Sequence, residues 1–147
     1  MESVDEGMCV TFLVRHAWLS MRSAVAAALA EHELSVQQYG TLLVLRDIPG
    51  QTIAEVGRKV GTARQSANEL ITGMERAGLL ERRANPADRR SHQIYLTDSG
   101  LARLAKANPV VRAVEAELEA DFTPTDRAAA RAWLTRMVNT EVPIDEP

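Results

Sequence analysis

The sequence predicts a mainly α-helical fold with one small β wing, and three observations support this fold class. Apolar residues recur at helical spacing through most of the chain, beginning with residues 8–31 and 35–46. Residues 52–77 have the pattern of two short helices separated by the turn Val60-Gly61, which is typical of a helix-turn-helix. Two strand-like segments around a basic loop follow directly. Together these features predict a winged helix-turn-helix with further helices at both ends.

The totals are ordinary for one globular domain, with 147 residues of which 46% are hydrophobic and 25% charged. The longest uncharged apolar run, within residues 23–30, is too short to span a bilayer, and the acidic start at 1–7 is unlike a signal peptide. A single cysteine leaves no internal disulfide and favours a reducing compartment. We therefore expect a cytoplasmic protein with no membrane partner.

The net charge of −3 is unevenly distributed. From Gln51 to Tyr95 the chain has eight basic and five acidic residues, a balance of +3, so the remainder carries −6. This asymmetry suits a protein that presents one basic surface to phosphate groups. An ordinary fluctuation of charge would give the same numbers.

The first predicted helix spans residues 8–31, contains no helix breaker and is rich in alanine. At about 1.5 Å per residue it would be over about 30 Å long, which is more than a small core needs. We therefore expect it to pack against a partner subunit. Ser35, with Gln38 three residues later, is expected to open a second helix through residue 46, and the loop 47–51 to close it.

The two helices of the helix-turn-helix have their own start and stop signals. Thr52 can cap the first with Glu55, and Thr62 repeats this arrangement with Gln65. Gly78 stands where the second helix needs a residue with positive φ to end. Apolar residues at helical spacing in the second helix are expected to face the core, namely Ala63, Ala67, Leu70, Ile71 and Met74.

After the second helix, residues 79–83 and 93–96 are strand-like and flank the charged loop 84–92. Thr97 then begins a long helix to about residue 120. Pro109 removes one backbone donor, so we predict a kink or a break near Asn108. The segment 123–126 combines an N-cap threonine with proline and predicts a last helix through about residue 138.

Three motifs in a fixed order make this pattern specific. The chain contains GLLER at 78–82, then DRR at 88–90, then LTDSG at 96–100. In order and spacing these residues resemble the MarR family of winged helix-turn-helix transcriptional regulators. The resemblance implies a single MarR-like domain over 1–147, in which 35–97 form the DNA-binding lobe. It also implies that the helical regions 8–31 and 98–138 of two subunits interlock into a homodimer.

The second helix of the helix-turn-helix presents a polar face that suits the major groove of DNA. Gln65 and Asn68 could pair with adenine, Arg64 with guanine or phosphate, and Glu69 with cytosine amino groups. Ser66 could meet a phosphate, and Thr62 precedes these residues in the turn. The alternative is that this face is merely solvated.

For the wing, the resemblance implies that Arg90 reaches the minor groove while Asp88 holds it in place through a charge-assisted hydrogen bond. Arg89 and Arg83 would meet phosphates and so set affinity more than sequence preference. One wing and one helix cover only a few base pairs. We therefore expect a homodimer on a palindromic double-stranded DNA site with half-site centres about 34–36 Å apart. Most members of the family repress transcription, so the resemblance favours a ligand-responsive repressor.

Two groups of residues could sense a signal. Cys9 lies near the start of the first helix, where a thiol pKa can be lowered, and this resembles the peroxide-sensing branch of the family. That branch keeps tyrosines near its cysteine, but the first helix here has none. The alternatives are therefore a thiol-based redox regulator and a buried, inert cysteine.

A small aromatic or anionic effector is the second possibility. Candidate ligand-binding residues lie on the first two helices, namely Arg15, His16, Trp18, Arg22 and Tyr39. Positions 15, 16 and 18 do not share one helix face, so a common pocket would be partial. Trp18 could instead pack at an interface, with His16 on the surface.

We predict no metal site and no cofactor, because the three histidines are widely separated and there is no CxxC or HxxxH motif. We also predict no enzymatic activity, since the chain lacks a phosphate-cradling glycine loop and a GxSxG motif. A winged helix that serves protein contacts without DNA binding remains an alternative. A steep loss of DNA affinity with rising salt would exclude it.

Overall fold

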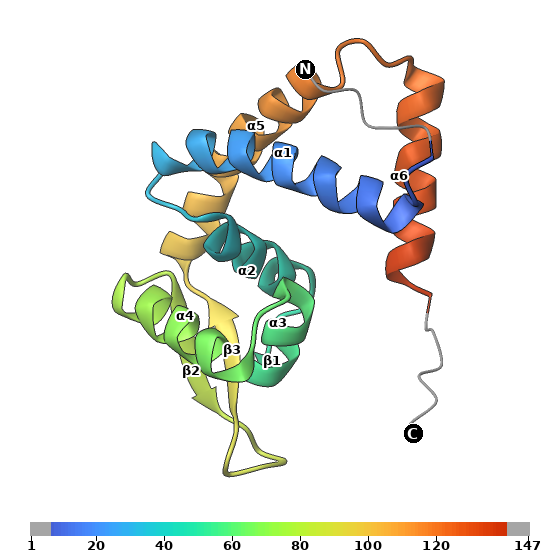
Figure 1. Cartoon of the computed structure of the whole chain (residues 1–147). Helices are drawn as coiled ribbons and strands as arrows, with labels where there is room; N and C mark the ends of the chain where they lie inside the picture. The colour runs from blue at the N-terminus through green and yellow to red at the C-terminus, as the bar shows by residue number, and fades with distance from the viewer. Residues whose placement is uncertain (1–6, 141–147) are drawn as a thin grey trace, which may run out of the picture. The chain divides into compact units, whose positions relative to one another are not determined.

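The computed structural model of the chain describes residues 7–140, while residues 1–6 and 141–147 lie outside the described part. It is mainly helical with one small antiparallel sheet, so the predicted fold class is confirmed (Figure 1). The chain divides into two compact units, Met1–Val114 and Glu115–Pro147. The described elements are α1 (Val10–Ala30), α2 (Val36–Asp47), β1 (Gln51–Thr52), α3 (Ile53–Val60), α4 (Arg64–Arg76), β2 (Leu80–Ala84), β3 (His92–Leu96), α5 (Asp98–Leu118) and α6 (Pro124–Val138).

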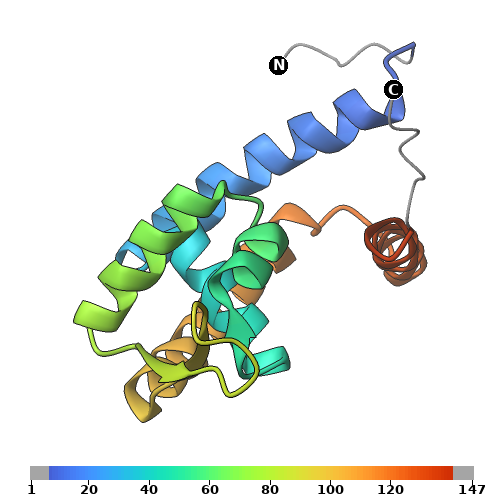
Figure 2. The same cartoon turned by 90° about the horizontal axis from the view of Figure 1, so that it is seen from below.

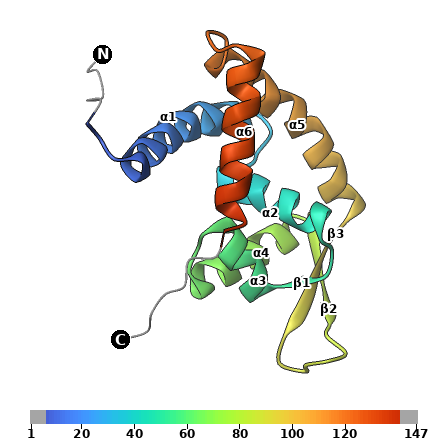
Figure 3. The same cartoon turned by 90° about the vertical axis from the view of Figure 1, so that its right-hand side faces the viewer.

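The sheet has the strand order β1-β3-β2, and both pairs are antiparallel. β2 and β3 form the predicted hairpin, which extends beyond α3 and α4 in Figures 1 and 3. β1 corrects the prediction, because its first residue, Gln51, was expected in a loop. Gln51 lies opposite Ile94, and the neighbouring Gly50 N–H donates to the Ile94 carbonyl at 3.0 Å. A strand of two residues is too short to show the alternation that marks strands in a sequence.

Buried apolar side chains of the first unit form one core beneath the helix-turn-helix. They come from α2, α3, α4, β2, β3 and α5, together with the last turn of α1. The innermost members are fully enclosed, namely Leu29, Leu42, Leu45, Ile71, Met74, Ile94 and Leu104. This core fixes α4 and the wing with respect to each other, so the surface between them is built on a rigid support.

The turn of the helix-turn-helix differs from its prediction in one respect. Gly61 adopts φ 77°, and the N–H groups of Gly61 and Thr62 both donate to the Gly57 carbonyl at 2.9 Å. Because Thr62 is still part of this turn, α4 begins at Arg64 with Ala63 as its N-cap and no side-chain cap. The predicted cap at Thr62 is therefore wrong, and so is the predicted burial of Ala63, which is exposed.

The other signals of the helix-turn-helix are confirmed. Thr52 caps α3 by accepting the Glu55 N–H at 3.2 Å. Gly78 has φ 78° just after α4. The remaining predicted core residues of α4 are enclosed as expected, with Ala67, Ile71 and Met74 buried and Leu70 half-buried.

No break interrupts α5, which continues through Pro109 from Asp98 to Leu118. A proline removes only one i→i−4 hydrogen bond. Ala107 and Val111, on either side of it, are buried in the core, and this packing holds both halves of that region in place. The predicted break is therefore wrong, and the alternative of a kink near Asn108 stays a prediction. The predicted cap at Thr97 is confirmed, since its hydroxyl accepts the Gly100 N–H at 3.1 Å.

The outer helices leave much of their apolar surface uncovered. In the first unit, residues 11–20 of α1 are all exposed, and Figures 2 and 3 both show this half of the helix extending beyond the other elements of that unit. In the second unit, Thr123 is the predicted N-cap of α6, with Pro124 at the first position, and it forms a capping box with Asp126. No residue of α6 is buried.

Candidate nucleic-acid interface

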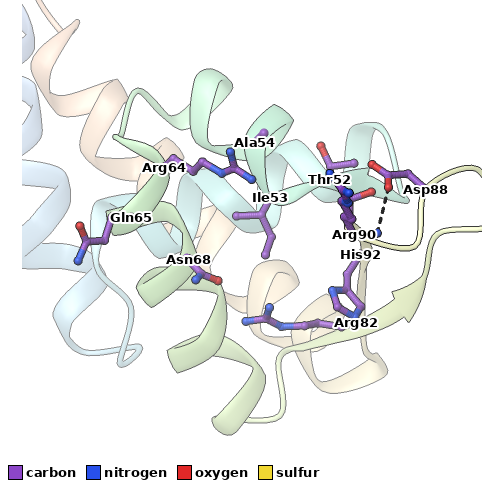
Figure 4. Close-up of a pocket in the computed structure, with 11 residues that line it drawn as sticks. Thr52, Ile53, Ala54, Arg64, Gln65, Asn68, Arg82, Asp88, Arg90 and His92 are labelled. Atoms are coloured by element: carbon purple, nitrogen blue, oxygen red, sulfur yellow. Dashed lines mark hydrogen bonds between the residues drawn. The ribbon is translucent and has the colours of Figure 1, made fainter.

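A cleft of about 780 Å³ lies between α4, the start of α3 and the wing. Figure 4 shows side chains from all three elements around the same space. The lining residues are Thr52, Ile53, Ala54, Arg64, Gln65, Asn68, Arg82, Asp88, Arg90, Ser91 and His92. Three arginines face one aspartate in this set, so the cleft has an excess of positive charge and suits an anionic partner.

Three of the predicted DNA-binding residues on α4 line the cleft, namely Arg64, Gln65 and Asn68. All three are exposed, and the spacing of 64, 65 and 68 places them on the first turns of the helix. Glu69 and Ser66 are also exposed but do not line the cleft, and neither does the half-buried Thr62. The amide and guanidinium groups at the start of α4 are therefore free to meet base edges or phosphates.

The wing loop is held by hydrogen bonds within itself. Asn85 donates through Nδ2 to the Ser91 hydroxyl at 2.9 Å and accepts the Ala87 N–H at 3.0 Å. The predicted charge-assisted bond between Asp88 and the Arg90 side chain is not among the described contacts. Asp88 Oδ1 instead accepts the main-chain N–H of Arg90 at 2.9 Å. This bond is the dashed line in Figure 4. Asp88 thus fixes the loop backbone and leaves the Arg90 guanidinium available.

The two neighbouring arginines of β2 lie on opposite faces of the sheet, since side chains alternate along a strand. Arg82 lines the cleft, although it was not predicted as a site residue. Arg83, which was predicted, lies outside the cleft. Its Nε donates to Glu81 Oε1 at 2.9 Å, and its guanidinium carbon is 4.0 Å from the centre of the Tyr95 ring. Arg89 is exposed in the loop and also lies outside the cleft.

The place of Arg82 follows from the register of the hairpin, which motif spacing in the sequence did not reveal. Arg82 lies opposite Ile94 in the register of the hairpin, and Ile94 is fully buried. An arginine on the core-facing side of a strand requires a polar partner. Ser91 and His92 line the cleft because they close the wing loop at the start of β3. Thr52, Ile53 and Ala54 line it because α3 begins beside the cleft.

The predicted effector residues separate in the structure. Trp18 and Arg22 line a second cleft of about 400 Å³ together with residues of α2 and with Lys59, Val60 and Gly61. Arg15 and His16 are exposed outside it, and the ring of His16 lies 5.2 Å from that of Phe12. The Tyr39 hydroxyl donates to Asn108 Oδ1 of α5 at 2.6 Å and does not line this cleft.

Cys9 is exposed and forms the N-cap of α1, so the alternative of a buried cysteine is wrong. Its thiol shares a hydrogen bond of 3.4 Å with the Thr11 hydroxyl. This bond, followed by the Phe12 backbone N–H, lowers the pKa of the Cys9 thiol. A lowered pKa increases the fraction of reactive thiolate at a given pH.

Within residues 7–140, no group of three or more His, Cys, Asp or Glu side chains is placed to hold a metal ion. None of the described helices is both long enough and apolar enough to cross a membrane.

A helix-turn-helix, a three-stranded sheet and a basic hairpin wing define this chain as a winged helix-turn-helix protein. A model described as the MarR family matches residues 32–91, which cover α2 through the wing loop. The chain belongs to the MarR family of winged helix-turn-helix transcriptional regulators.

Relatives of similar length support this assignment. The HTH-type transcriptional repressor Rv2887 of Mycobacterium tuberculosis is 29% identical over 126 residues, which are 86% of this chain and 91% of the relative. Its structure in complex with salicylic acid is similar with a TM-score of 0.76, 27% identity and coverage of 91% and 99%. The transcriptional repressor CouR, bound to a 23-mer DNA duplex, is similar with a TM-score of 0.77, 25% identity and coverage of 95% and 100%.

Proposed function

We propose that this protein is a sequence-specific DNA-binding repressor that acts as a homodimer on a palindromic operator and responds to a small ligand. The cleft between α4 and the wing is the observation that carries this proposal. It brings Arg64, Gln65 and Asn68 of the recognition helix together with Arg90 of the wing. The proposed place of action is the cytoplasm, because the operator DNA lies there.

Each side of the cleft has a separate role in this proposal. Gln65 and Asn68 read base edges in the major groove, where an amide can make two hydrogen bonds to adenine. Arg64 pairs with guanine or with phosphate, and Arg90 enters the minor groove. Arg89 contributes to phosphate attraction from the exposed loop. The similarity to CouR, which is bound to a DNA duplex, supports this arrangement.

Uncovered apolar side chains support the homodimer. α1 exposes six large apolar residues, namely Val10, Phe12, Leu13, Val14, Trp18 and Leu19. α6 exposes four more, namely Trp133, Leu134, Met137 and Val138. Large apolar side chains exposed in such numbers on one helix indicate an interaction site. A second copy of the chain would cover these helices and add a second DNA-binding lobe for the other half-site.

The second cleft is the proposed effector site. Arg22 and Lys59 supply two positive charges, Trp18 supplies an aromatic face, and Val44 is one of several apolar residues in the lining. This composition suits a small aromatic acid, and the relative Rv2887 is complexed with salicylic acid. Lys59 belongs to the last turn of α3, and Val60 and Gly61 lead into α4. A ligand here would therefore act on the recognition helix through the turn that precedes it.

The redox alternative is retained because Cys9 is exposed and has a lowered thiol pKa. It predicts that peroxide releases the protein from DNA and that Cys9→Ser abolishes this release. Equal release of the wild type and the Cys9→Ser variant, or no release of either, would show that Cys9 does not act as a redox sensor.

Selection of bound sequences from a random pool of DNA duplexes at near-physiological salt tests the proposed function. We expect an inverted repeat for the wild type and its loss for the Arg90→Ala variant. Salicylate added to the recovered complex is then expected to lower the affinity, and less so for Arg22→Gln. No enriched sequence and no salt-dependent DNA binding would favour the protein-contact alternative.

A further inference from the structure

Arg82 stands where the strand pattern calls for an apolar residue. Its partner across the hairpin, Ile94, is fully buried. The side chain of Arg82 is itself only 22% exposed, although it is charged. A charged group in such a place is costly unless the protein supplies polar partners. Both partners found here belong to α4, so Arg82 joins the wing to the recognition helix.

The two contacts to α4 are of different kinds. Nη2 of Arg82 donates to the Thr72 hydroxyl at 2.6 Å. Nε lies 3.2 Å from Glu75 Oε2 as an ion pair, without the alignment of a hydrogen bond. Thr72 and Glu75 are three residues apart and therefore lie on one face of α4, which continues from Asn68 in the cleft. A planar guanidinium that reaches two points on a helix fixes direction as well as distance.

We propose that Arg82 is a positioning residue that sets the distance and angle between the recognition helix and the wing. This inference rests on the proposed DNA-binding function. Arg90 and Asn68 must reach adjacent grooves of one duplex at the same time, so their relative placement determines whether both contacts form. Arg82 lines the same cleft as these two residues, on the strand that leads into the wing loop (Figure 4).

The ion pair of the neighbouring Arg83 with Glu81 provides a matched control, in which Glu81 is the residue changed. Arg83 bonds Glu81 on the opposite face of the sheet and makes no contact with α4 among those described. Glu75→Gln and Glu81→Gln each remove one negative charge, so both raise the general attraction of the protein for DNA by a similar amount. If Arg82 positions the wing, the two changes act differently on operator binding.

The test compares three proteins: the wild type, a Thr72→Val/Glu75→Gln double variant and Glu81→Gln. For each protein we would measure the affinity for the selected operator and the base preference at each position of the operator. NMR would give the backbone order parameters of residues 84–91. We expect the double variant to bind about five- to tenfold more weakly in spite of its lost negative charge, and its wing loop to be less ordered. Its loss of base preference should fall on the positions that Arg90→Ala also affects. Glu81→Gln should bind as well as the wild type or better.

An Arg82→Lys variant provides a second measurement, because lysine keeps the charge and cannot reproduce the planar two-point contact. It should reproduce the weaker binding while unfolding at a similar temperature. Unchanged affinity together with an unchanged wing order in both variants would overturn the proposal. If the wild type itself bound no duplex, the proposed function would fail, and the order parameters alone would decide whether Arg82 positions the wing.

Discussion

The side chain of Arg90 extends from the wing loop into the cleft that α4 borders. Its main-chain N–H is bonded to Asp88 Oδ1, so the loop is fixed while the guanidinium stays exposed. This arrangement prepares the arginine for DNA without using its donors inside the protein. It also explains why an aspartate, which would repel phosphate on its own, stands within a basic loop.

At the scale of single residues, Arg90→Ala is expected to cost about 1–3 kcal/mol of binding free energy on the selected operator. The reason is the loss of a minor-groove contact from a residue that contributes no described side-chain bond to the fold. Gel-shift titration measures the affinity. Arg83→Ala is the control, because it removes the same charge two residues after Glu81, outside the cleft. Equal weakening by both variants would mean that general electrostatics, not the wing contact, accounts for the effect.

Prediction from the sequence named five of the eleven residues that line the cleft. Arg64, Gln65, Asn68, Asp88 and Arg90 were found because motif spacing and helical periodicity identify them. Arg82 and Arg83 were exchanged, because adjacent residues of a strand face opposite sides and a motif does not show which side meets the helix. That choice depends on the register of β2 with β3, which only the structure provides.

At the scale of elements, capping signals predicted most boundaries correctly. Ser35, Thr52, Thr97 and Thr123 all accept an N–H three residues on. Thr62 did not, because its own N–H still completes the turn at Gly57 and the helix starts later. The sequence signal for an N-cap is local. Whether a residue becomes the N-cap, however, depends on how many residues the preceding turn needs. Pro109 is likewise a local signal, and the break that it predicted is absent because Ala107 and Val111 pack in the core on either side of it.

The contact between α5 and Leu79, the residue before β2, depends on Gly100. A Cβ at this buried position would lie 2.2 Å from the Leu79 carbonyl oxygen, which belongs to the backbone. Gly100→Ala is therefore expected to destabilise the fold by about 1–3 kcal/mol or more. Urea denaturation measures this change.

Gly73→Ala in α4 is the matched control, because its Cβ would meet no atom within 4 Å. Alanine should stabilise that exposed helix position by about 0.5–1 kcal/mol. A Gly100→Ala protein as stable as the wild type would show that α5 does not approach the backbone of Leu79 so closely.

At the scale of the whole molecule, the two compact units each expose apolar helix surface. α1 has only Leu29 fully buried, and α6 has no buried residue. Helices of this kind are seldom stable in isolation, since packing supplies most helix stability in proteins. The single domain over 1–147 with a dimerisation region at 8–31 and 98–138 stays a prediction, and it requires that a second copy covers these surfaces.

A charge on α1 tests this requirement. Leu13 is 40% exposed, so Leu13→Asp should leave the fold of the chain intact while preventing a second copy from packing there. Sedimentation velocity is expected to show a dimer for the wild type and a monomer for the variant, with weaker operator binding by the monomer. Ile48→Asp, at a residue 49% exposed at the end of α2, is the control and should remain dimeric. A dimeric Leu13→Asp protein would place the interface elsewhere.

The exposed wing loop has a further consequence for its chemistry in solution. Trypsin cleaves after arginine and lysine, and exposed loops are preferred sites of cleavage. Arg89 and Arg90 are both exposed, whereas Arg82 is largely enclosed against α4. Trypsin should therefore cut the free protein at the wing, and operator DNA bound over the wing should slow that cut. The rate of cleavage after Arg89 and Arg90 would therefore measure how much of the protein is bound to the operator, without a label on the DNA.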